Sequence, residues 1–167
     1  RECHTSGRIH DIGFRAWVAA QRHMGFEMDP RELTDVERAK LRNVTQWWKD
    51  NRDWRHTADI KRLSAADPAI IAEIQVSSQQ DRFVAFIGNA ETSAWSCPAP
   101  VQLTGLKHDT LYSVTLVNRD EKTAASHGIS GLDAGTLKLS GRFLMSHGVD
   151  LPSQFPDRMW VLEGVAE

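Results

Sequence analysis

Apolar positions over residues 9–24 recur at helical spacing. Steps of three and four residues place one set of apolar side chains on a single helix face: Ile9, Ile12, Ala16 and Ala20. Phe14, Trp17 and Val18 occupy another side of the same turns. The period predicts a helix that is apolar around much of its circumference. Such a helix requires burial on two sides, between a sheet and another helix.

A second helix is predicted over residues 35–52. Pro30 excludes regular helix or strand structure in the segment between the two helices. Thr34 and Glu37 have the spacing of a capping box, in which each side chain accepts a hydrogen bond from the other residue's backbone N–H. An apolar stripe follows at Leu41, Val44 and Trp48, and the segment closes in the tryptophan-rich stretch WWKDNRDWR.

After His56 the apolar period changes from helical spacing to alternation. Short β-rich runs, separated by Asp, Gly, Asn, Ser and Pro, occupy residues 60–63, 69–76, 82–90, 100–106, 110–118, 135–145 and 157–164. Seven or eight strands without an intervening helix predict an antiparallel sandwich or barrel. The fold class expected is therefore α+β, with a helical part over residues 1–56 and an antiparallel β-sandwich domain over residues 57–167.

Composition narrows the function classes. The 167 residues are 41 % hydrophobic and carry a net charge of −2, which offers no electrostatic basis for binding nucleic acid or an anionic membrane. We expect no transmembrane span and no secretory leader. Cys3 and Cys97 form no spaced framework, so two free thiols and a cytoplasmic location are expected. The start at Arg1, without an initiator Met, suggests a chain cut from a longer one.

The opening stretch CHTSGRIHD has the residue types of a metal or nucleophile site. Zinc ligands come as a close pair followed by a distant pair, whereas Cys3 and His4 are adjacent and diverge. His10 and Asp11 begin a helix, where an Asp suits the positive N-terminal end. No third group orients a Cys/His nucleophile there. We therefore expect no metal, no cofactor and no catalytic residue in this stretch.

The remaining motifs also favour structure over chemistry. The SHG triplets at residues 126–128 and 146–148 lack nucleophile-elbow spacing and are typical of turns. The chain contains neither a P-loop nor a dinucleotide-binding glycine motif. Packing is the expected role of the tryptophans. Trp54, Trp95 and Trp160 have the weakest packing explanation and are the candidates for stacking on a sugar ring.

The order of these features resembles the late part of the microbial α-galactosidases of glycoside hydrolase family 36. Both the helical half and the closing segments carry the resemblance, at residues 4–8, 14–16, 25–29, 34–37, 49–52, 139–141 and 144–148. The family has a (β/α)₈ barrel followed by a C-terminal antiparallel β-domain. The resemblance implies that residues 1–56 are the last loop and helices of that barrel, and that residues 57–167 are the β-domain.

The resemblance also implies what this chain does not carry. Retaining glycosidases use two carboxylates about 5–5.5 Å apart, and the family's motifs for them lie upstream of any residue present here. Asp11, Glu27 and Asp29 have the right chemistry but stand in helix-start and turn contexts, so no catalytic residue is assigned. His4, Thr5 and Arg8 belong to a loop at the barrel face where active sites form. They either approach the substrate or hold the loop.

The expected function is thus the C-terminal portion of an α-galactosidase, supporting the barrel structurally and inactive in isolation. Its partners are the rest of its own catalytic domain, an α-galactoside bound by that domain, and a further copy of the chain in a homo-oligomer. The alternative is a free-standing carbohydrate-binding or interaction β-sandwich.

Overall fold

The computed structural model describes residues 6–96, 99–121, 130–152 and 156–167 of the chain. It divides into two units, Arg1–His56 (unit 1) and Thr57–Glu167 (unit 2). Within the described ranges, no helix is both long and apolar enough to cross a membrane.

Unit 1 consists of α1 (Ile12–Ala20), the short 3₁₀ turn η1 (Pro30–Glu32) and α2 (Asp35–Arg55). Both predicted helices are confirmed, although α1 is shorter than the expected 9–24. It begins at the Asp11 cap and ends before the turn at Gln21. The predicted capping box of α2 is also confirmed, since Thr34 and Glu37 exchange side-chain and backbone hydrogen bonds.

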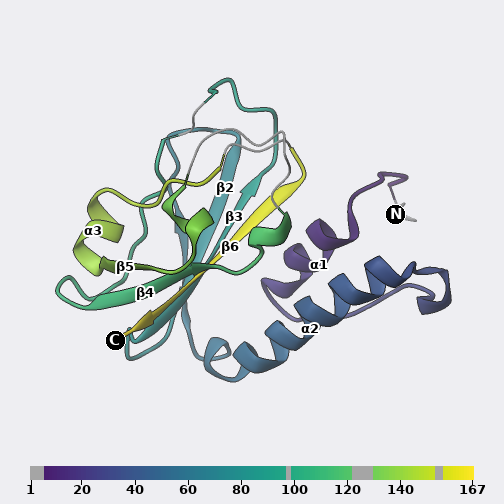
Figure 1. The fold of residues 1–167 in the computed structure, drawn as a ribbon, viewed down its shortest axis with the longest axis horizontal. Coiled ribbons are helices and arrows are strands. Elements are labelled where there is room, and N and C mark those ends of the chain that lie inside the picture. The colour runs from purple at the N-terminus through teal and green to yellow at the C-terminus, as the bar shows by residue number, and fades with distance from the viewer. Residues whose placement is uncertain (1–5, 97–98, 122–129, 153–155) are drawn as a thin grey trace. The chain divides into compact units, whose positions relative to one another are not determined.

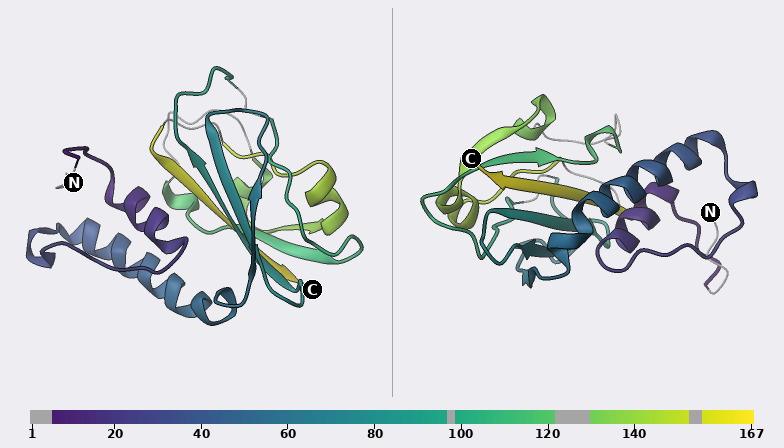
Figure 2. Two further views of the ribbon diagram at one scale, coloured as in Figure 1. Left: turned by 180° about the vertical axis from the view of Figure 1, so that it is seen from behind. Right: turned by 90° about the horizontal axis from the view of Figure 1, so that it is seen from below.

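The two helices of unit 1 run in the same direction. Asp11, which caps the start of α1, contacts Lys40 in the first half of α2 at 3.4 Å. At the other end, Arg55 donates to the carbonyl oxygen of Ala20 at 2.6 Å. Residues 21–34 therefore return along the length of α1 before α2 begins (Figures 1 and 2). Because the helices are parallel, their C-terminal ends lie together.

The apolar character of α1 is only partly satisfied. Ile12, Ala16 and Ala20 are buried, as the helical period predicts. Ile9 precedes the helix and is 76 % exposed, while Val18 is 43 % exposed. The side of α1 that carries Val18 therefore retains accessible apolar surface.

Unit 2 is one antiparallel sheet of six strands in the order β1-β2-β3-β6-β4-β5 (Figure 1). The strands are β1 (Asp59–Leu63), β2 (Ile70–Val76), β3 (Arg82–Asn89), β4 (Leu111–Leu116), β5 (Leu137–Ser140) and β6 (Arg158–Ala166). The antiparallel organisation is confirmed. The two sheets expected of a sandwich are not found among the named strands. All six are hydrogen-bonded into one sheet, and that sheet faces a layer of loops and short helices.

One predicted strand and the second part of another belong to this covering layer. Residues 100–106 contribute only an isolated bridge, between Val101 and Val149. Residues 141–145, expected to continue a strand, form the helix α3 (Gly141–Ser146) instead. The Ser140 hydroxyl accepts the backbone N–H of Phe143 and thus supplies an N-cap that ends β5. This local hydrogen bond overrides the strand-like pattern of GTLKLSGRFLM.

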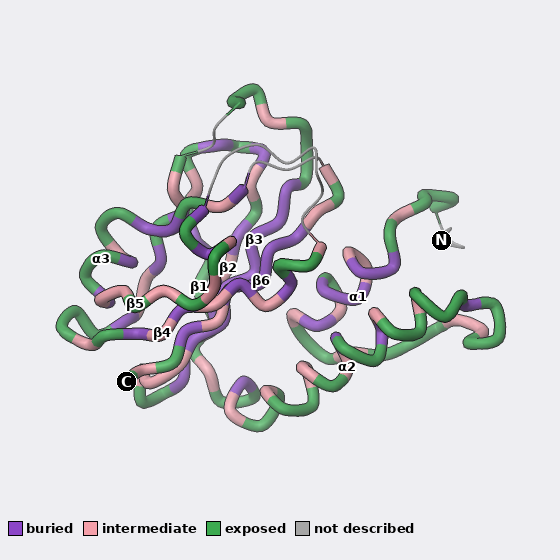
Figure 3. The backbone as a smooth tube through the Cα atoms, viewed as in Figure 1, coloured by how far each residue is buried: buried purple, intermediate pink, exposed green. Residues whose placement is uncertain are grey.

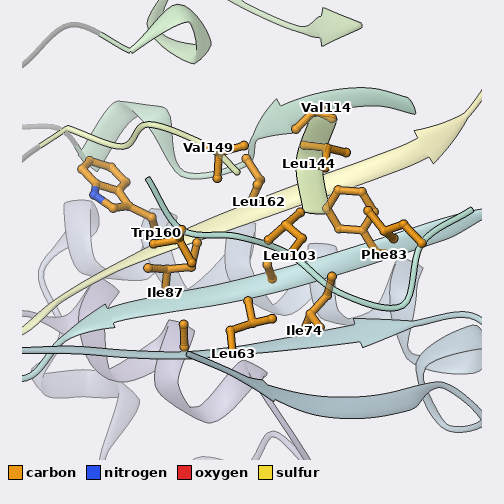
Figure 4. Packing of buried hydrophobic residues seen from close by; sticks show 14 of the residues in the cluster. Leu63, Ile74, Phe83, Ile87, Leu103, Val114, Leu144, Val149, Trp160 and Leu162 are labelled. Carbon is orange, nitrogen blue, oxygen red and sulfur yellow. The ribbon is translucent and has the colours of Figure 1, made fainter. Parts of the chain in front are cut away.

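The core lies between one face of the sheet and this covering layer (Figure 4). The sheet contributes alternate residues of each strand, including Ile74, Phe83, Ile87, Val114 and Leu162. The covering layer contributes Val101, Leu103, Leu106, Leu132, Leu144 and Val149. Figure 3 shows that buried residues follow β3 and β6, the central strands, most continuously. Alternating burial along β4 reflects this core, whereas β3 and β6 are buried at consecutive positions.

Tyr112, the only tyrosine of the chain, joins the sheet to the covering layer. Its side chain is fully buried, and its hydroxyl donates to the carbonyl oxygen of Gln80 at 2.7 Å. The same hydroxyl accepts the backbone N–H of Lys107 at 3.2 Å. The ring packs edge-on against Phe83, with ring centroids 5.7 Å apart. One side chain thus holds strand β4, the β2–β3 turn and the loop before β4.

A glycine opposite Phe83 makes room for this packing. Gly164 of β6 pairs with Phe83 of β3 across the two central strands. A β-carbon at position 164 would overlap three ring carbons of Phe83. The Phe83 ring therefore lies over the glycine. A larger residue at position 164 requires the ring at position 83 to move or to be smaller.

We predict that Gly164→Ala lowers the free energy of unfolding of unit 2 by about 1–3 kcal/mol, the usual cost of overpacking a core. Gly25→Ala is the matched control, because a β-carbon there has no neighbour within 4 Å. Urea unfolding followed by far-UV circular dichroism measures both. In the double variant Gly164→Ala, Phe83→Leu, the smaller side chain should recover part of the loss. Equal stabilities of Gly164→Ala and Gly25→Ala would contradict the assigned overlap.

Candidate functional site

The loop that the resemblance places near the substrate is described only from Ser6 onward. His4 and Thr5, like Cys3, lie outside the described residues. Arg8 is exposed, and its backbone N–H approaches the Ser6 hydroxyl at 3.5 Å. Gly7 has a positive φ of 67°, which allows the chain to turn there. The described part of the loop thus forms a turn with a solvent-accessible Arg8.

Asp11 serves as the N-cap of α1. Its Oδ1 accepts the backbone N–H of Gly13 at 2.9 Å and that of Phe14 at 3.4 Å. Burial raises the pKa of the Asp11 carboxyl, but Lys40 and the two N–H groups favour the charged form more strongly, and the net effect lowers the pKa below its ordinary value of 3.8. The carboxylate that sequence composition suggested for metal or acid–base chemistry is thus committed to a cap.

The other two carboxylates considered from the sequence are Asp29 and Glu27. Asp29 caps η1 and forms a two-pronged ion pair with Arg31, with Nη2 to Oδ2 at 2.6 Å. The Arg31 guanidinium lowers the pKa of the Asp29 carboxyl. Glu27 is exposed on the segment before η1. Asp11 and Asp29 are thus both engaged as helix caps.

Tryptophans and one arginine form the contact between α1 and α2. Trp17 and Trp47 pack edge-to-face with ring centroids 5.2 Å apart. Arg55 lies over the Trp47 ring at 5.1 Å and donates to the carbonyl oxygens of Ala20 and Gln21. The Trp48 indole donates to the carbonyl oxygen of Arg22 at 2.8 Å. Packing is therefore the role of these three tryptophans, as predicted.

Arg55 is a structural residue that the sequence reasoning missed. It is only 7 % exposed, although arginine is mostly exposed in proteins. The available signal was its place at the end of WWKDNRDWR, three residues beyond the predicted helix end, since cationic side chains near a helix C-terminus cap carbonyl groups. What the sequence did not reveal is that the carbonyls belong to the other helix.

The three tryptophans considered for sugar stacking differ in how far they are exposed. Trp160 is 3 % exposed, and its indole donates to the carbonyl oxygen of Pro152, so it belongs to the core. Trp54 is partly buried and donates to Asn51 at 2.9 Å. Trp95 is 44 % exposed. Since Trp160 is buried, the three rings do not form the exposed row that a free-standing sugar-binding module would need.

The described residues of each unit line a cavity or groove. In unit 2, a cavity of about 20 Å³ between the sheet and the covering layer is lined by Ile87, Val101 and Trp160 among others, which is room for one water molecule. In unit 1, a groove of about 320 Å³ lies between α1, α2 and residues 24–28. Its walls include Ile12, Ala16 and Leu41, with Arg15 and Glu27 as polar residues. The groove is open and mainly apolar.

The sequence matches the glycosyl hydrolase family 36 C-terminal domain over residues 70–162, more than half of the chain. The chain therefore belongs to glycoside hydrolase family 36. It is 27 % identical over 163 residues to an alpha-galactosidase of Escherichia coli, and 29 % identical over 112 residues to the bifunctional alpha-galactosidase/sucrose kinase AgaSK of Mediterraneibacter gnavus. It covers 23 % of the first relative and 12 % of the second.

Solved structures share the fold along nearly the whole chain. The galactosidase domain of AgaSK matches 98 % of this chain and 21 % of its own, with a TM-score of 0.79 at 23 % identity. The family 36 alpha-galactosidase AgaB from Geobacillus stearothermophilus matches 98 % of this chain and 20 % of its own, with the same TM-score at 21 % identity. The 167 residues thus span about a fifth of these larger proteins.

The charge of Asp11 has a testable pH signature. Because its pKa is lower in the folded chain than the ordinary 3.8, its charge stabilises unit 1 above that pH. The contribution is lost as the pH falls through the folded-state pKa. Asp11→Asn retains a capping side chain and removes the charge. We predict that Asp11→Asn lowers the free energy of unfolding by about 0.3–1 kcal/mol near neutral pH, a small effect because the group is partly exposed. This difference shrinks as the pH falls through the folded-state pKa of Asp11.

Urea unfolding at a series of pH values, followed by tryptophan fluorescence, measures this difference. Asp109→Asn is the control, because the Asp109 side chain is 89 % exposed. A difference between Asp11→Asn and the parent chain that is constant from pH 7 to the acid limit would contradict the electrostatic role.

Proposed function

We propose that this chain is the C-terminal part of an α-galactosidase that removes terminal α-linked galactose. In this proposal unit 1 is the last loop and helices of a (β/α)₈ barrel. Unit 2 is a β-domain that supports the barrel. The observation that carries the proposal is the family 36 C-terminal match, together with relatives four or more times longer than the region they share with this chain.

The direction of the helices in unit 1 supports the barrel assignment. In a (β/α)₈ barrel, consecutive helices run parallel, and each pair is joined through a strand that runs the opposite way. Here α1 and α2 are parallel, and residues 21–34 return between them. Residues 24–27 within this return form neither helix nor turn. We propose that residues 24–28 hold the position of the last barrel strand, so that the loop at residues 4–8 follows the strand before it.

The chemistry of unit 2 supports a structural role. The cavity between its sheet and its covering layer has room for one water molecule, and its buried Asn118 joins two segments of the chain. Asn118 donates to the carbonyl oxygen of Met159 and accepts the N–H of Val161. Such interactions are those of a stable supporting layer.

The substrate and partners follow from the same proposal. Two solved structures of one relative, the family 36 alpha-galactosidase AgaA from Geobacillus stearothermophilus, are described in complex with raffinose and with stachyose. This supports an α-galactoside as the substrate of the intact enzyme. His4, Thr5 and Arg8 are proposed to lie on a loop near that substrate, with loop support as the simpler role. The missing part of the catalytic domain is the main partner, a homo-oligomer is compatible with the proposal, and a cytoplasmic location is proposed.

The purified 167-residue chain should release no product from a chromogenic α-galactoside, because both catalytic carboxylates are proposed to lie in the missing part. The E. coli alpha-galactosidase serves as the positive control under the same conditions. Release that is proportional to the chain's concentration, and that stays with the chain through a second chromatographic step, would contradict the proposal.

The unpartnered barrel surface should make the chain self-associate. Phe26 stands on the proposed strand position, borders the groove of unit 1 and is 51 % exposed. We predict a concentration-dependent increase in the mass measured by light scattering. Phe26→Asp should shift that mass toward the monomer, because it places a charge on the apolar surface.

Phe143→Asp is the matched control, since Phe143 is 42 % exposed on α3 and lies outside unit 1. A parent chain that remains monomeric at all concentrations would contradict the prediction. An equal effect of the two substitutions would also contradict it.

A further inference from the structure

Two histidines of unit 1 lie side by side at the end where the parallel helices terminate. His56 is the C-cap residue of α2, and His23 follows the end of α1 by three residues. Their ring centroids are 5.8 Å apart, with the ring planes inclined at 53°. Both side chains are exposed. The pair is separated by 33 positions in the sequence, so only the packing of the helices brings it together.

The backbone that carries His23 is fixed directly to α2. The Trp48 indole holds the carbonyl group of Arg22, the residue before His23. Arg55, the residue before His56, holds the carbonyl groups of Ala20 and Gln21 with bonds of 2.6 and 2.9 Å. The segment before each imidazole is therefore anchored in the same contact. A pair of ligands held in this way loses little freedom when it binds an ion.

The separation of the rings suits one shared metal ion. A metal–imidazole bond is about 2.0–2.1 Å long and the ring adds about 1 Å to its centroid, so two imidazoles on one ion have centroids no more than about 6 Å apart. The observed 5.8 Å lies within this limit. Small rotations of two exposed side chains then suffice to direct one nitrogen of each ring at the ion.

The electrostatics of this end both help and restrict the choice of ion. Because α1 and α2 are parallel, the negative ends of two helix dipoles meet near the pair and favour a cation. Arg55 already neutralises part of this charge, and Arg52 lies over the nearby Trp48 ring. Hard cations, which need carboxylate oxygens, are therefore disfavoured. Ions that bind neutral imidazole strongly are suited, and Cu²⁺ binds such ligands most strongly in the first-row series.

We propose that His23 and His56 form a two-imidazole binding site for a divalent transition-metal ion, with Cu²⁺ bound more tightly than Ni²⁺ or Zn²⁺. Among the residues that the structure describes, no group of three His, Cys, Asp or Glu side chains could hold a metal ion. Water completes the coordination, so the ion remains accessible. A bound ion links the end of α2 to the chain that leaves α1, and thereby stabilises unit 1.

The test is a Cu²⁺ titration of the untagged chain at pH 7.5, in a background where Cys3 and Cys97 are replaced by serine to prevent thiol chemistry. Tryptophan fluorescence reports binding, because Cu²⁺ quenches a nearby indole and Trp48 contacts the backbone next to His23. We expect one saturable equivalent. His23→Ala and His56→Ala should each weaken it by about tenfold or more, since even outer-shell partners of metal ligands cost about 10–100-fold.

His147→Ala and His4→Ala are the matched controls and should retain the parent affinity. Circular dichroism verifies that each variant is folded, and electron paramagnetic resonance of the bound Cu²⁺ should show coupling to two imidazole nitrogens. Parent-like binding by His23→Ala or by His56→Ala overturns the proposal. Loss of the saturable equivalent in His4→Ala, or coupling to a single nitrogen, overturns it equally.

Discussion

The core of unit 2 depends on the packing of the Phe83 ring against Gly164, on its two central strands. The absent side chain at Gly164 leaves room for the Phe83 ring, and that ring is in edge-to-face contact with Tyr112. The Tyr112 hydroxyl in turn holds the backbone of Gln80 and Lys107. A change of volume at this point is transmitted from strand to strand and into the loops, because a close-packed core has little free space to absorb it.

Unit 1 depends on a different kind of contact, in which polar side chains of one helix satisfy the end of another. The last carbonyl groups of a helix have no partner within it. At the end of α1 the carbonyl groups of Ala20 and Gln21 accept hydrogen bonds from Arg55, and the carbonyl of Arg22 accepts one from Trp48. The edge-to-face contact of Trp17 and Trp47 completes the arrangement. This contact fixes the parallel direction of the helices, which supports a barrel origin, and it also brings the histidine pair together.

Family membership and the proposed barrel origin thus rest on different parts of the chain. The family match falls on the β-unit, whereas the support for a barrel origin comes from the helices and the segment between them. Asp11 and Asp29, which resemble catalytic groups by residue type, cap helical turns instead. The same chemical property, an affinity for positive partial charge, serves both roles, so residue type alone does not distinguish a cap from an acid–base group.

Local features of this protein were predictable from the sequence, because they depend on neighbours within one or two turns. The capping box at Thr34, the period of α2 and the alternation of the strands are of this kind. The strand pattern across Ser140 failed because a single side-chain hydrogen bond started α3 there. Tertiary structure alone decided which strands share one sheet, that Arg55 is buried and that His23 meets His56. These features depend on contacts between residues far apart in the chain, and no local period encodes such contacts.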